Sequence, residues 1–413
     1  MLIDIFAAAA AAAPPFDPEA ATRAYLDTLQ GAARAKSDSY FEGGYWIILW
    51  GALATIVAAW LTLRFRWSAA WSGWAGRVTK RRGLQAGLYA IPWTIISSLL
   101  VLPWSIYTGW YREKQYDLMN LSLGGWLGEQ AIALVVTLVF TMILFSILFA
   151  VIRAAPRSWW LWGTGAVTLL IALSVMVAPV FISPLFNTYT PMEAGPLRDQ
   201  ILGMARANEV PADNVWVFDQ SRQHKRISAN VSGLGPTIRI SLNDNLLERS
   251  TPAEVKSVMG HELGHYVLNH IPKSVAVLTL IMALALFLLW WATPRILARW
   301  GAKWGVKGVD DPAVVPVFTI VMTLYFLVMT PALNTLVRTQ ESEADAFGLD
   351  AAREPDGFAA IAMKLSEYRK IEPGALEEAL FFDHPSGRTR VRMAMDWKAR
   401  HLAEVAGKAE AKQ

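Results

Sequence analysis

Six long apolar runs, separated by short polar segments, dominate the hydropathy pattern of this chain. Each run is about 20 residues or longer, the length that an α-helix needs to cross the hydrocarbon core of a bilayer. This pattern predicts a polytopic α-helical membrane protein. The predicted spans are residues 45–64, 85–109, 131–152, 158–182, 274–292 and 313–336.

The spans divide the chain into five segments. An N-terminal segment (1–43) precedes four spans (44–182), and a polar region (183–273) separates these from the last two spans (274–336). A second polar region (337–413) ends the sequence. The opening Met1–Ala13 is apolar but short and has no basic residues, so it predicts neither a signal peptide nor a span. We expect the two polar regions to fold together outside the bilayer.

The first polar region has the pattern of a small α+β unit. A helical stretch (193–208) precedes one strand (215–218), and residues 237–242 alternate between polar and apolar side chains, which predicts a second strand. Between the strands, Ser228–Gly235 has an extended pattern that ends in glycines, which suits a hairpin. An exposed edge of such a sheet could pair with an extended peptide through main-chain hydrogen bonds. Asn230 and Gly233 lie on this candidate edge and are expected to bind substrate; a plain hairpin that binds nothing is the alternative.

Composition supports the membrane prediction. The chain is 54% hydrophobic and 17% charged, less charged than most soluble domains. Its net charge of +4 does not indicate nucleic-acid binding, because the basic residues cluster in short loops between apolar runs. Tryptophans gather at the ends of the predicted spans, as at a membrane interface. Cysteine is absent, so a metal ion would be held by nitrogen and oxygen atoms alone.

The segment after residue 250 predicts a metal-binding helix. Thr251-Pro252-Ala253-Glu254 is a capping box that starts a helix, and apolar residues then recur at helical spacing. His261-Glu262-Leu263-Gly264-His265 follows on that helix. Residues four apart share one helix face, so both imidazoles could hold one zinc ion, with Glu262 as the general base. The alternative is a pair of structural histidines that form hydrogen bonds in an apolar bundle.

A second acidic helix could complete the metal site. Catalytic zinc commonly takes three protein ligands, and two histidines with one carboxylate form a known set. Glu341 and Asp345 are four residues apart and share a face, so Glu341 could bind the metal while Asp345 orients a histidine. Glu343 should point elsewhere. A solvated acidic patch is the alternative.

Two further residues, His384 and Arg390, lie in and after a polar loop near the end of the chain. An imidazole or guanidinium directed at the oxyanion of a tetrahedral intermediate lowers the barrier to amide hydrolysis. Both residues could act there if the C-terminal region folds over the metal; a His-Pro loop without such a role is the alternative. The other histidines, His224, His270 and His401, have no ligand spacing and are expected to be structural or solvated.

The order of these segments resembles the integral-membrane zinc CAAX prenyl endopeptidases over roughly residues 105–395. The resemblance is carried by Trp110–Tyr116, Phe181–Asn187 with Thr190–Glu193, Ser228–Gly235, the His-Glu-x-x-His segment, Glu341–Phe347 and His384-Pro385 with Arg390. It implies that Glu341 is the third zinc ligand and that His384 and Arg390 contact substrate. Family members generally have seven spans, and the one that is not counted in this chain would lie between Trp67 and Leu84. A second proline is also usual where this chain has Ser386.

These patterns predict a mainly α fold, a polytopic helical membrane protein with a zincin-like α+β catalytic domain that carries a small β-sheet. The expected function is a zinc metalloendopeptidase with one zinc ion per chain. Its substrates would be membrane-associated or C-terminally prenylated (CAAX-type) peptides or proteins, its other partner the bilayer, and nucleic acid is not expected. A broader membrane quality-control metalloprotease of the heat-shock type is an alternative, and a non-catalytic polytopic protein is another. The expected location is a bacterial plasma membrane, or an endoplasmic-reticulum-type membrane if the source is eukaryotic.

Charge also predicts which side of the membrane the metal faces. Twelve basic residues fall in the loops after the first, third and fifth spans, and the loop on the opposite side has two, Arg112 and Lys114. The positive-inside rule therefore places the metal domain away from the cytoplasm. The family resemblance implies the opposite orientation. The twelve residues are Arg64, Arg66, Arg77, Lys80, Arg81, Arg82, Arg153, Arg157, Arg295, Arg299, Lys303 and Lys307.

Overall fold

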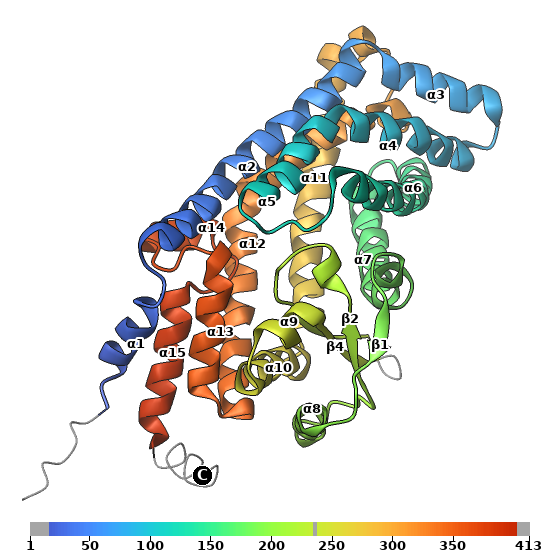
Figure 1. Ribbon diagram of the computed structural model, residues 1–413. Coiled ribbons are helices and arrows are strands. Elements are labelled where there is room, and N and C mark those ends of the chain that lie inside the picture. The colour runs from blue at the N-terminus through green and yellow to red at the C-terminus, as the bar shows by residue number, and fades with distance from the viewer. Residues whose placement is uncertain (1–15, 234–237, 403–413) are drawn as a thin grey trace, which may run out of the picture.

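The structure is a computed structural model that describes residues 16–233 and 238–402. Met1–Ala13 and the tip of the expected hairpin, residues 234–237, lie outside these ranges. Long helices fill the upper part of the molecule, and shorter helices and a small sheet gather in its lower part (Figure 1). The described residues therefore form the mainly helical fold with a small sheet that the sequence predicts.

Six helices in the described part of the chain are long and apolar enough to cross a membrane, in agreement with the six predicted spans. Large apolar side chains cover their outer surfaces; Val328 is 77% exposed, Leu280 71% and Phe181 68%. Such surfaces are stable against lipid and costly against water, so they indicate where the bilayer lies. The helices are α2 (Gly31–Arg64), α4 (Arg82–Ile106), α6 (Leu123–Ala154), α7 (Trp159–Val177), α11 (His270–Trp304) and α12 (Val315–Ala352).

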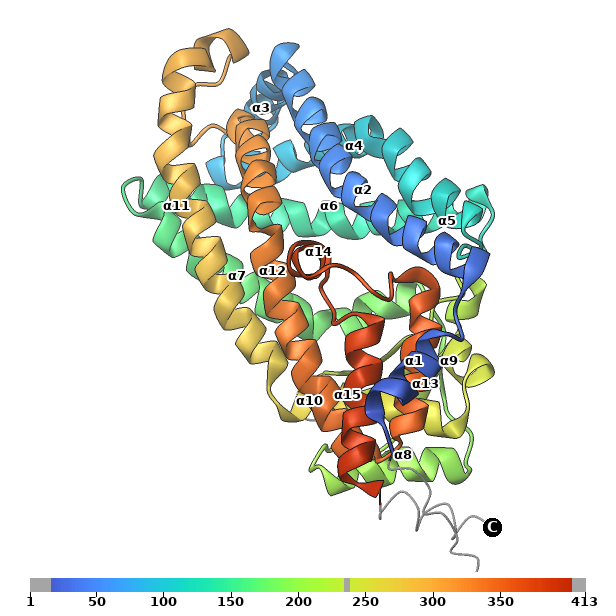
Figure 2. The same ribbon diagram turned by 90° about the vertical axis from the view of Figure 1, so that its left-hand side faces the viewer.

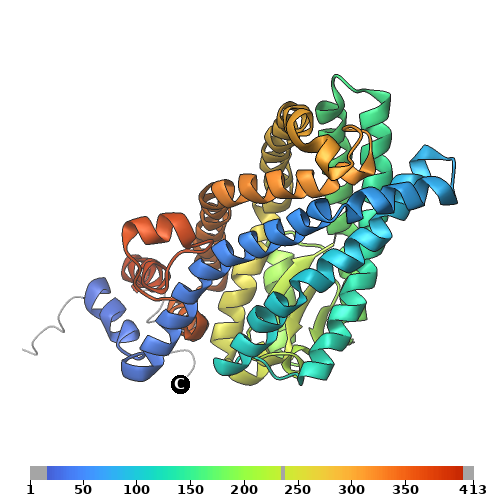
Figure 3. The same cartoon turned by 90° about the horizontal axis from the view of Figure 1, so that it is seen from above.

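The stretch between Trp67 and Leu84 holds a short helix, α3 (Trp67–Val78), and not a seventh span. Its 12 residues are too few, because a helix of this length extends only about 18 Å against a hydrocarbon core of about 30 Å. Seen from above, α3 projects beyond the other helices (Figure 3).

The lower part of the molecule is built around a four-stranded sheet in the order β1-β2-β4-β3. Strands β2 and β4 are parallel, and the other two pairs are antiparallel. The hairpin of β3 with β4 is confirmed for the described residues, although β4 begins two residues later than expected; β1 was not expected. The strands are β1 (Tyr189–Pro191), β2 (Val215–Phe218), β3 (Ala229–Ser232) and β4 (Arg239–Asn243).

One face of the sheet packs on α10 (Pro252–Val267). This face carries Val215 of β2 and Ile240 and Leu242 of β4. These side chains are completely buried, as are Met259 and Leu263 of α10. Burial of each such side chain contributes about 1.5–3 kcal/mol. The packing fixes α10 beneath the sheet and leaves β3 at an edge.

Helix α12 joins the membrane to the lower domain. It runs without a break from Val315 to Ala352, past the boundary that the sequence suggested at residue 336. Figure 2 shows it descending from among the long helices to the level of α10 and α15. The division into domains stays a prediction, but residues 315–336 and the following acidic segment belong to one continuous helix, with Pro331 inside it.

Seven further short helices lie in the described part of the chain. α1 packs against α15, and α13 packs against both α10 and α15. They are α1 (Pro18–Leu26), α8 (Pro196–Ala207), α9 (Asp244–Arg249), α13 (Pro355–Leu365) and α15 (Gly387–Arg400), with α14 (Ala375–Phe381) following α13 and α5 (Arg112–Gln115) following α4.

Candidate metal centre

Helix α10 starts where its capping box predicts. The Thr251 hydroxyl accepts a hydrogen bond from the Glu254 backbone N–H, and the Glu254 carboxylate accepts one from the Thr251 N–H at 2.6 Å. Pro252 occupies the first turn, where its lack of an N–H costs nothing. These contacts fix the first turn of the helix two and a half turns before His261.

Small residues allow α10 and α12 to touch along their backbones. A methyl group added at Gly348 would lie 2.7 Å from the His261 backbone nitrogen, and one at Gly260 would lie 2.8 Å from the Gly348 carbonyl oxygen. A methyl group at Gly264 would lie 3.2 Å from the Cα atom of Ala344. Small residues four apart on facing helices permit this close approach. It brings Glu341 of α12 to the histidines of α10.

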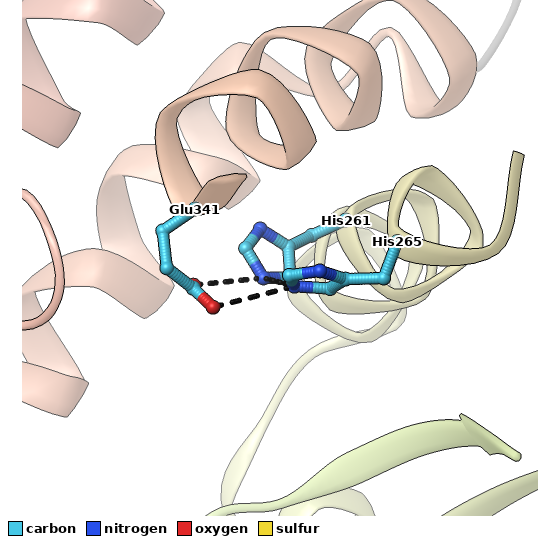
Figure 4. Close-up of side chains that lie close together, drawn as sticks. All are labelled: His261, His265 and Glu341. Atoms are coloured by element: carbon cyan, nitrogen blue, oxygen red, sulfur yellow. Dashed lines mark hydrogen bonds and ion pairs between the residues drawn. The ribbon is translucent and has the colours of Figure 1, made fainter. Parts of the chain in front are cut away.

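His261, His265 and Glu341 converge on one point (Figure 4). Glu341 Oε2 lies 3.2 Å from His261 Nε2, and Glu341 Oε1 lies 3.4 Å from His265 Nε2. The two Nε2 atoms are 3.1 Å apart. Ligand atoms held at about 2.0–2.1 Å by a tetrahedral zinc ion lie about 3.3 Å from one another. The spacing of these ligand atoms therefore fits a zinc ion.

Electrostatics at this point favour a cation. Burial alone would lower the pKa of His261, but its hydrogen bonds to Asp345 and Glu341 raise that pKa to about 10. The surroundings thus stabilise positive charge at the imidazole. A divalent ion can meet the same demand, with the histidines neutral.

Asp345 and Arg390 hold His261 from behind. Asp345 Oδ1 lies 2.7 Å from His261 Nδ1, so Nε2 is left for the metal. The Arg390 guanidinium donates to both carboxylate oxygens of Asp345, at 2.8 and 2.5 Å, and Asp345 is completely buried. Asp345 lies where the sequence suggested. Arg390 was expected to act on the oxyanion; its Nε and Nη2 donate to Asp345, its side chain also lines the cavity of Glu262, and its action on the oxyanion stays a prediction.

The second histidine has a support that the sequence did not suggest. His265 Nδ1 lies 2.8 Å from His270 Nδ1, and His270 Nε2 lies 3.0 Å from Glu343 Oε2. A two-residue turn between α10 and α11 produces this contact, since Asn269 adopts a left-handed conformation (φ 57°) that returns His270 toward His265. With Nε2 of His265 facing the metal, its Nδ1–H donates to His270, which donates to Glu343. Glu343 points away from the metal, as expected, and His270 is a buried structural residue whose contact with His265 the histidine spacing did not suggest.

Glu262 and His384 lie on a cavity of about 170 Å³ beside the metal ligands. Burial raises the pKa of the Glu262 carboxyl, which suits a group that accepts and returns a proton. His384 Nε2 lies 3.2 Å from Glu341 Oε2, and its Nδ1 lies 2.9 Å from Asp383. Ser386 caps α15 through its hydroxyl, so the residue that replaces the family's usual proline starts a helix.

The edge strand β3 lies along the same site. Ile227, Ser228 and Ala229, at its start, line the cavity of Glu262. Gly233, at its other end, adopts a positive φ of 99° and lines a second, larger cavity of about 810 Å³ together with His265. Asn230 lies between these ends, opposite Ser241 of β4. The geometry allows Asn230 and Gly233 to contact a peptide, and their role stays a prediction.

Two family models match this chain. Residues 191–398 match peptidase family M48, and residues 22–188 match a model described as CAAX prenyl protease N-terminal, five membrane helices. Four of the described helices in residues 22–188 meet the length and composition of a span, and α3 is the short helix among them.

Relatives and a solved structure agree with these matches. The chain is 24% identical to a Bacillus subtilis protein named uncharacterized metalloprotease YhfN, over 78% of this chain and 76% of the relative. It is 24% identical to CAAX prenyl protease 1 of Saccharomyces cerevisiae (73% and 70% covered) and 23% identical to the Homo sapiens homolog (72% and 70%). The crystal structure of S. mikatae Ste24p superposes with a TM-score of 0.73 over 91% of this chain and 94% of that chain. At 19% identity, this last likeness concerns the fold.

Proposed function

Because the chain belongs to peptidase family M48, we propose that it is a membrane-embedded zinc metalloendopeptidase that cleaves membrane-associated or C-terminally prenylated proteins. The observation that carries this proposal is the convergence of His261, His265 and Glu341 beside Glu262. These two imidazoles and one carboxylate would hold one zinc ion and leave a position open toward the cavity.

When bound, zinc supplies a Lewis acid that polarises the scissile carbonyl and makes water more acidic. Glu262 takes the proton from the attacking water and returns it to the leaving amine. His384, whose Nε2 faces the centre, donates a hydrogen bond to the developing oxyanion. Asp345 and Arg390 act through His261, because their contacts fix its ring and tautomer.

The substrate would bind as an extended strand on β3. That edge passes the metal ligands between the two cavities, so a peptide paired with it presents a bond to Glu262. Relatives named CAAX prenyl protease 1 support a prenylated substrate, and the embedding helices suit a lipid-anchored one.

The test uses the purified chain and its Glu262→Gln variant. The variant keeps all three metal-binding side chains but lacks the base, so we expect zinc content to be unchanged and peptide cleavage to fall by at least ~100-fold. Cleavage at the wild-type rate would contradict the role of Glu262. Comparison of a farnesylated C-terminal peptide with its unprenylated form then separates a prenyl protease from a broader quality-control protease, which would cut both.

A further inference from the structure

One charged group in the cavity of Glu262, Arg369, has no partner for its side chain among the described residues. Arg369 follows the 3₁₀ turn Ser366–Tyr368, and its side chain lines this cavity together with His384 and Arg390. Within residues 16–233 and 238–402, its guanidinium makes no hydrogen bond or ion pair. None of the roles derived above uses it.

The neighbouring charges do not neutralise Arg369 by contact. Arg390 is paired with Asp345, and His384 lies against Asp383 and Glu341. Burial lowers the pKa of the Arg369 guanidinium, the charge of Arg390 adds to this effect, and Asp383 and Glu341 oppose it. A half-buried cation without a partner is costly, so an anionic ligand would bind there favourably.

The backbone that carries Arg369 is fixed. The Ser37 hydroxyl of α2 is within hydrogen-bond distance of two backbone carbonyl oxygens, that of Ser366 at 2.6 Å and that of Arg369 at 3.2 Å, and can donate to either. Two residues on, the Ile371 carbonyl accepts a hydrogen bond from the Arg388 N–H at 3.1 Å. The guanidinium is therefore presented to the cavity from an anchored segment.

Arg369 also lies on one defined side of the bond to be cut. The cavity that it lines is the one at the start of β3, whereas the end of β3 at Gly233 opens to the other cavity. A peptide paired with β3 would thus place residues from one side of the scissile bond beside Arg369. The volume of about 170 Å³ is small for a ligand site, so the group that reaches Arg369 lies within about two residues of that bond.

We propose that Arg369 binds a carboxylate of the peptide substrate, close to the scissile bond on the side of Ile227–Ala229. The planar guanidinium fork matches a carboxylate with two parallel hydrogen bonds. The carboxylate can be the peptide's own C-terminus, when cleavage occurs near the end of the chain, or an Asp or Glu side chain. This inference rests on the proposed function for the presence of a peptide.

The test measures binding without cleavage, in the zinc-loaded Glu262→Gln background. Three matched peptides end in a free carboxylate, in a carboxamide, and in a carboxamide with one Glu near the end. We expect at least one carboxylate-bearing peptide to bind about 10- to 100-fold more tightly than the plain carboxamide. The tighter of the two identifies the source of the carboxylate.

Arg369→Gln should remove this difference, and Arg369→Lys should keep part of it. Arg392→Gln is the control, because Arg392 lies on α15, partly exposed, and is paired with Glu19 and Asp396 outside the cavity. Equal binding of the three peptides, or an unchanged ratio in Arg369→Gln at normal zinc content, would overturn the proposal. If the zinc-loaded parent chain cuts no peptide and yet Arg369 still distinguishes the three, the proposed function fails and the carboxylate site stands.

Discussion

Gly348 of α12 lies against the backbone of His261 on α10, so closely that a methyl group at Gly348 would meet the His261 nitrogen at 2.7 Å. The atoms in the way are backbone atoms of α10, which cannot move aside as a flexible side chain can. The distance between Glu341 and the histidines is therefore set by the absence of a side chain at Gly348.

Gly348→Ala should push α10 and α12 apart. We expect it to destabilise the protein by about 1–3 kcal/mol and to weaken zinc binding, because Glu341 moves away from both imidazoles. Gly203→Ala is the control, since a methyl group at Gly203 in α8 meets nothing within 4 Å. Thermal unfolding and chelator competition measure the two effects. Unchanged zinc affinity in Gly348→Ala would show that the helix contact does not set the metal geometry.

His270→Ala and Glu343→Gln should both weaken zinc binding, by about 10- to 100-fold, although neither residue touches the metal. Each change removes a link that orients His265 through its Nδ1. Lys273→Met is the matched control, because it removes only the exposed ion pair of Lys273 with Glu343. Competition with a fluorescent zinc indicator gives the zinc affinities. Equal zinc affinities for the three variants would show that the hydrogen-bond chain from His265 through His270 to Glu343 does not support the metal site.

Arg390→Met should cost about 3–5 kcal/mol of stability, because it leaves the buried Asp345 carboxylate facing His261 alone. Asp345→Asn combined with Arg390→Met removes the unpaired charge and should cost less than the two single changes added together. Denaturant unfolding of the four proteins in one detergent measures the difference. Additive costs would mean that the two side chains do not act as a pair.

Zinc removal should lower the stability of the folded chain. At free zinc 1,000 times its dissociation constant, binding contributes about 4 kcal/mol, which a chelator removes. Glu262→Gln should keep this zinc-dependent stabilisation, because Glu262 is not among the converging ligands, and Glu341→Gln should lose most of it. The midpoint of thermal unfolding with and without zinc reports both. A similar zinc-dependent rise in all three proteins would exclude Glu341 as a ligand.

The distribution of basic residues predicts a metal domain outside the cytoplasm, and the natural absence of cysteine makes this testable. Lys307→Cys and Glu193→Cys place single thiols at exposed positions on opposite sides of the six spans. In intact cells, an impermeant maleimide should label Glu193→Cys and should reach Lys307→Cys only after permeabilisation. The reverse pattern would place the metal centre in the cytoplasm.

Much of the architecture follows from local pattern. Apolar runs of about 20 residues predict the membrane-spanning helices. The i, i+4 spacing of His261 and His265 predicts that both lie on one face of a helix. The link from His265 to His270 is different, because it depends on the left-handed turn at Asn269, which the spacing of histidines does not reveal. Strand β1 contains three residues, too few for alternation to show. Arg369 is ordinary in sequence and becomes distinctive only when α13 and the His384 loop enclose it with Glu262.

One helix, α12, carries both the exposed apolar side chains Leu324 and Val328, which suit contact with lipid, and the ligand Glu341 near its lower end. No loop lies between them, but Pro331 lies inside the helix, so a tilt that the bilayer imposes on the upper part reaches that carboxylate through the bend that a proline produces. Bilayer thickness should therefore affect metal binding. We expect the same chain, reconstituted in short-chain and in long-chain lipids, to bind its metal with different affinities.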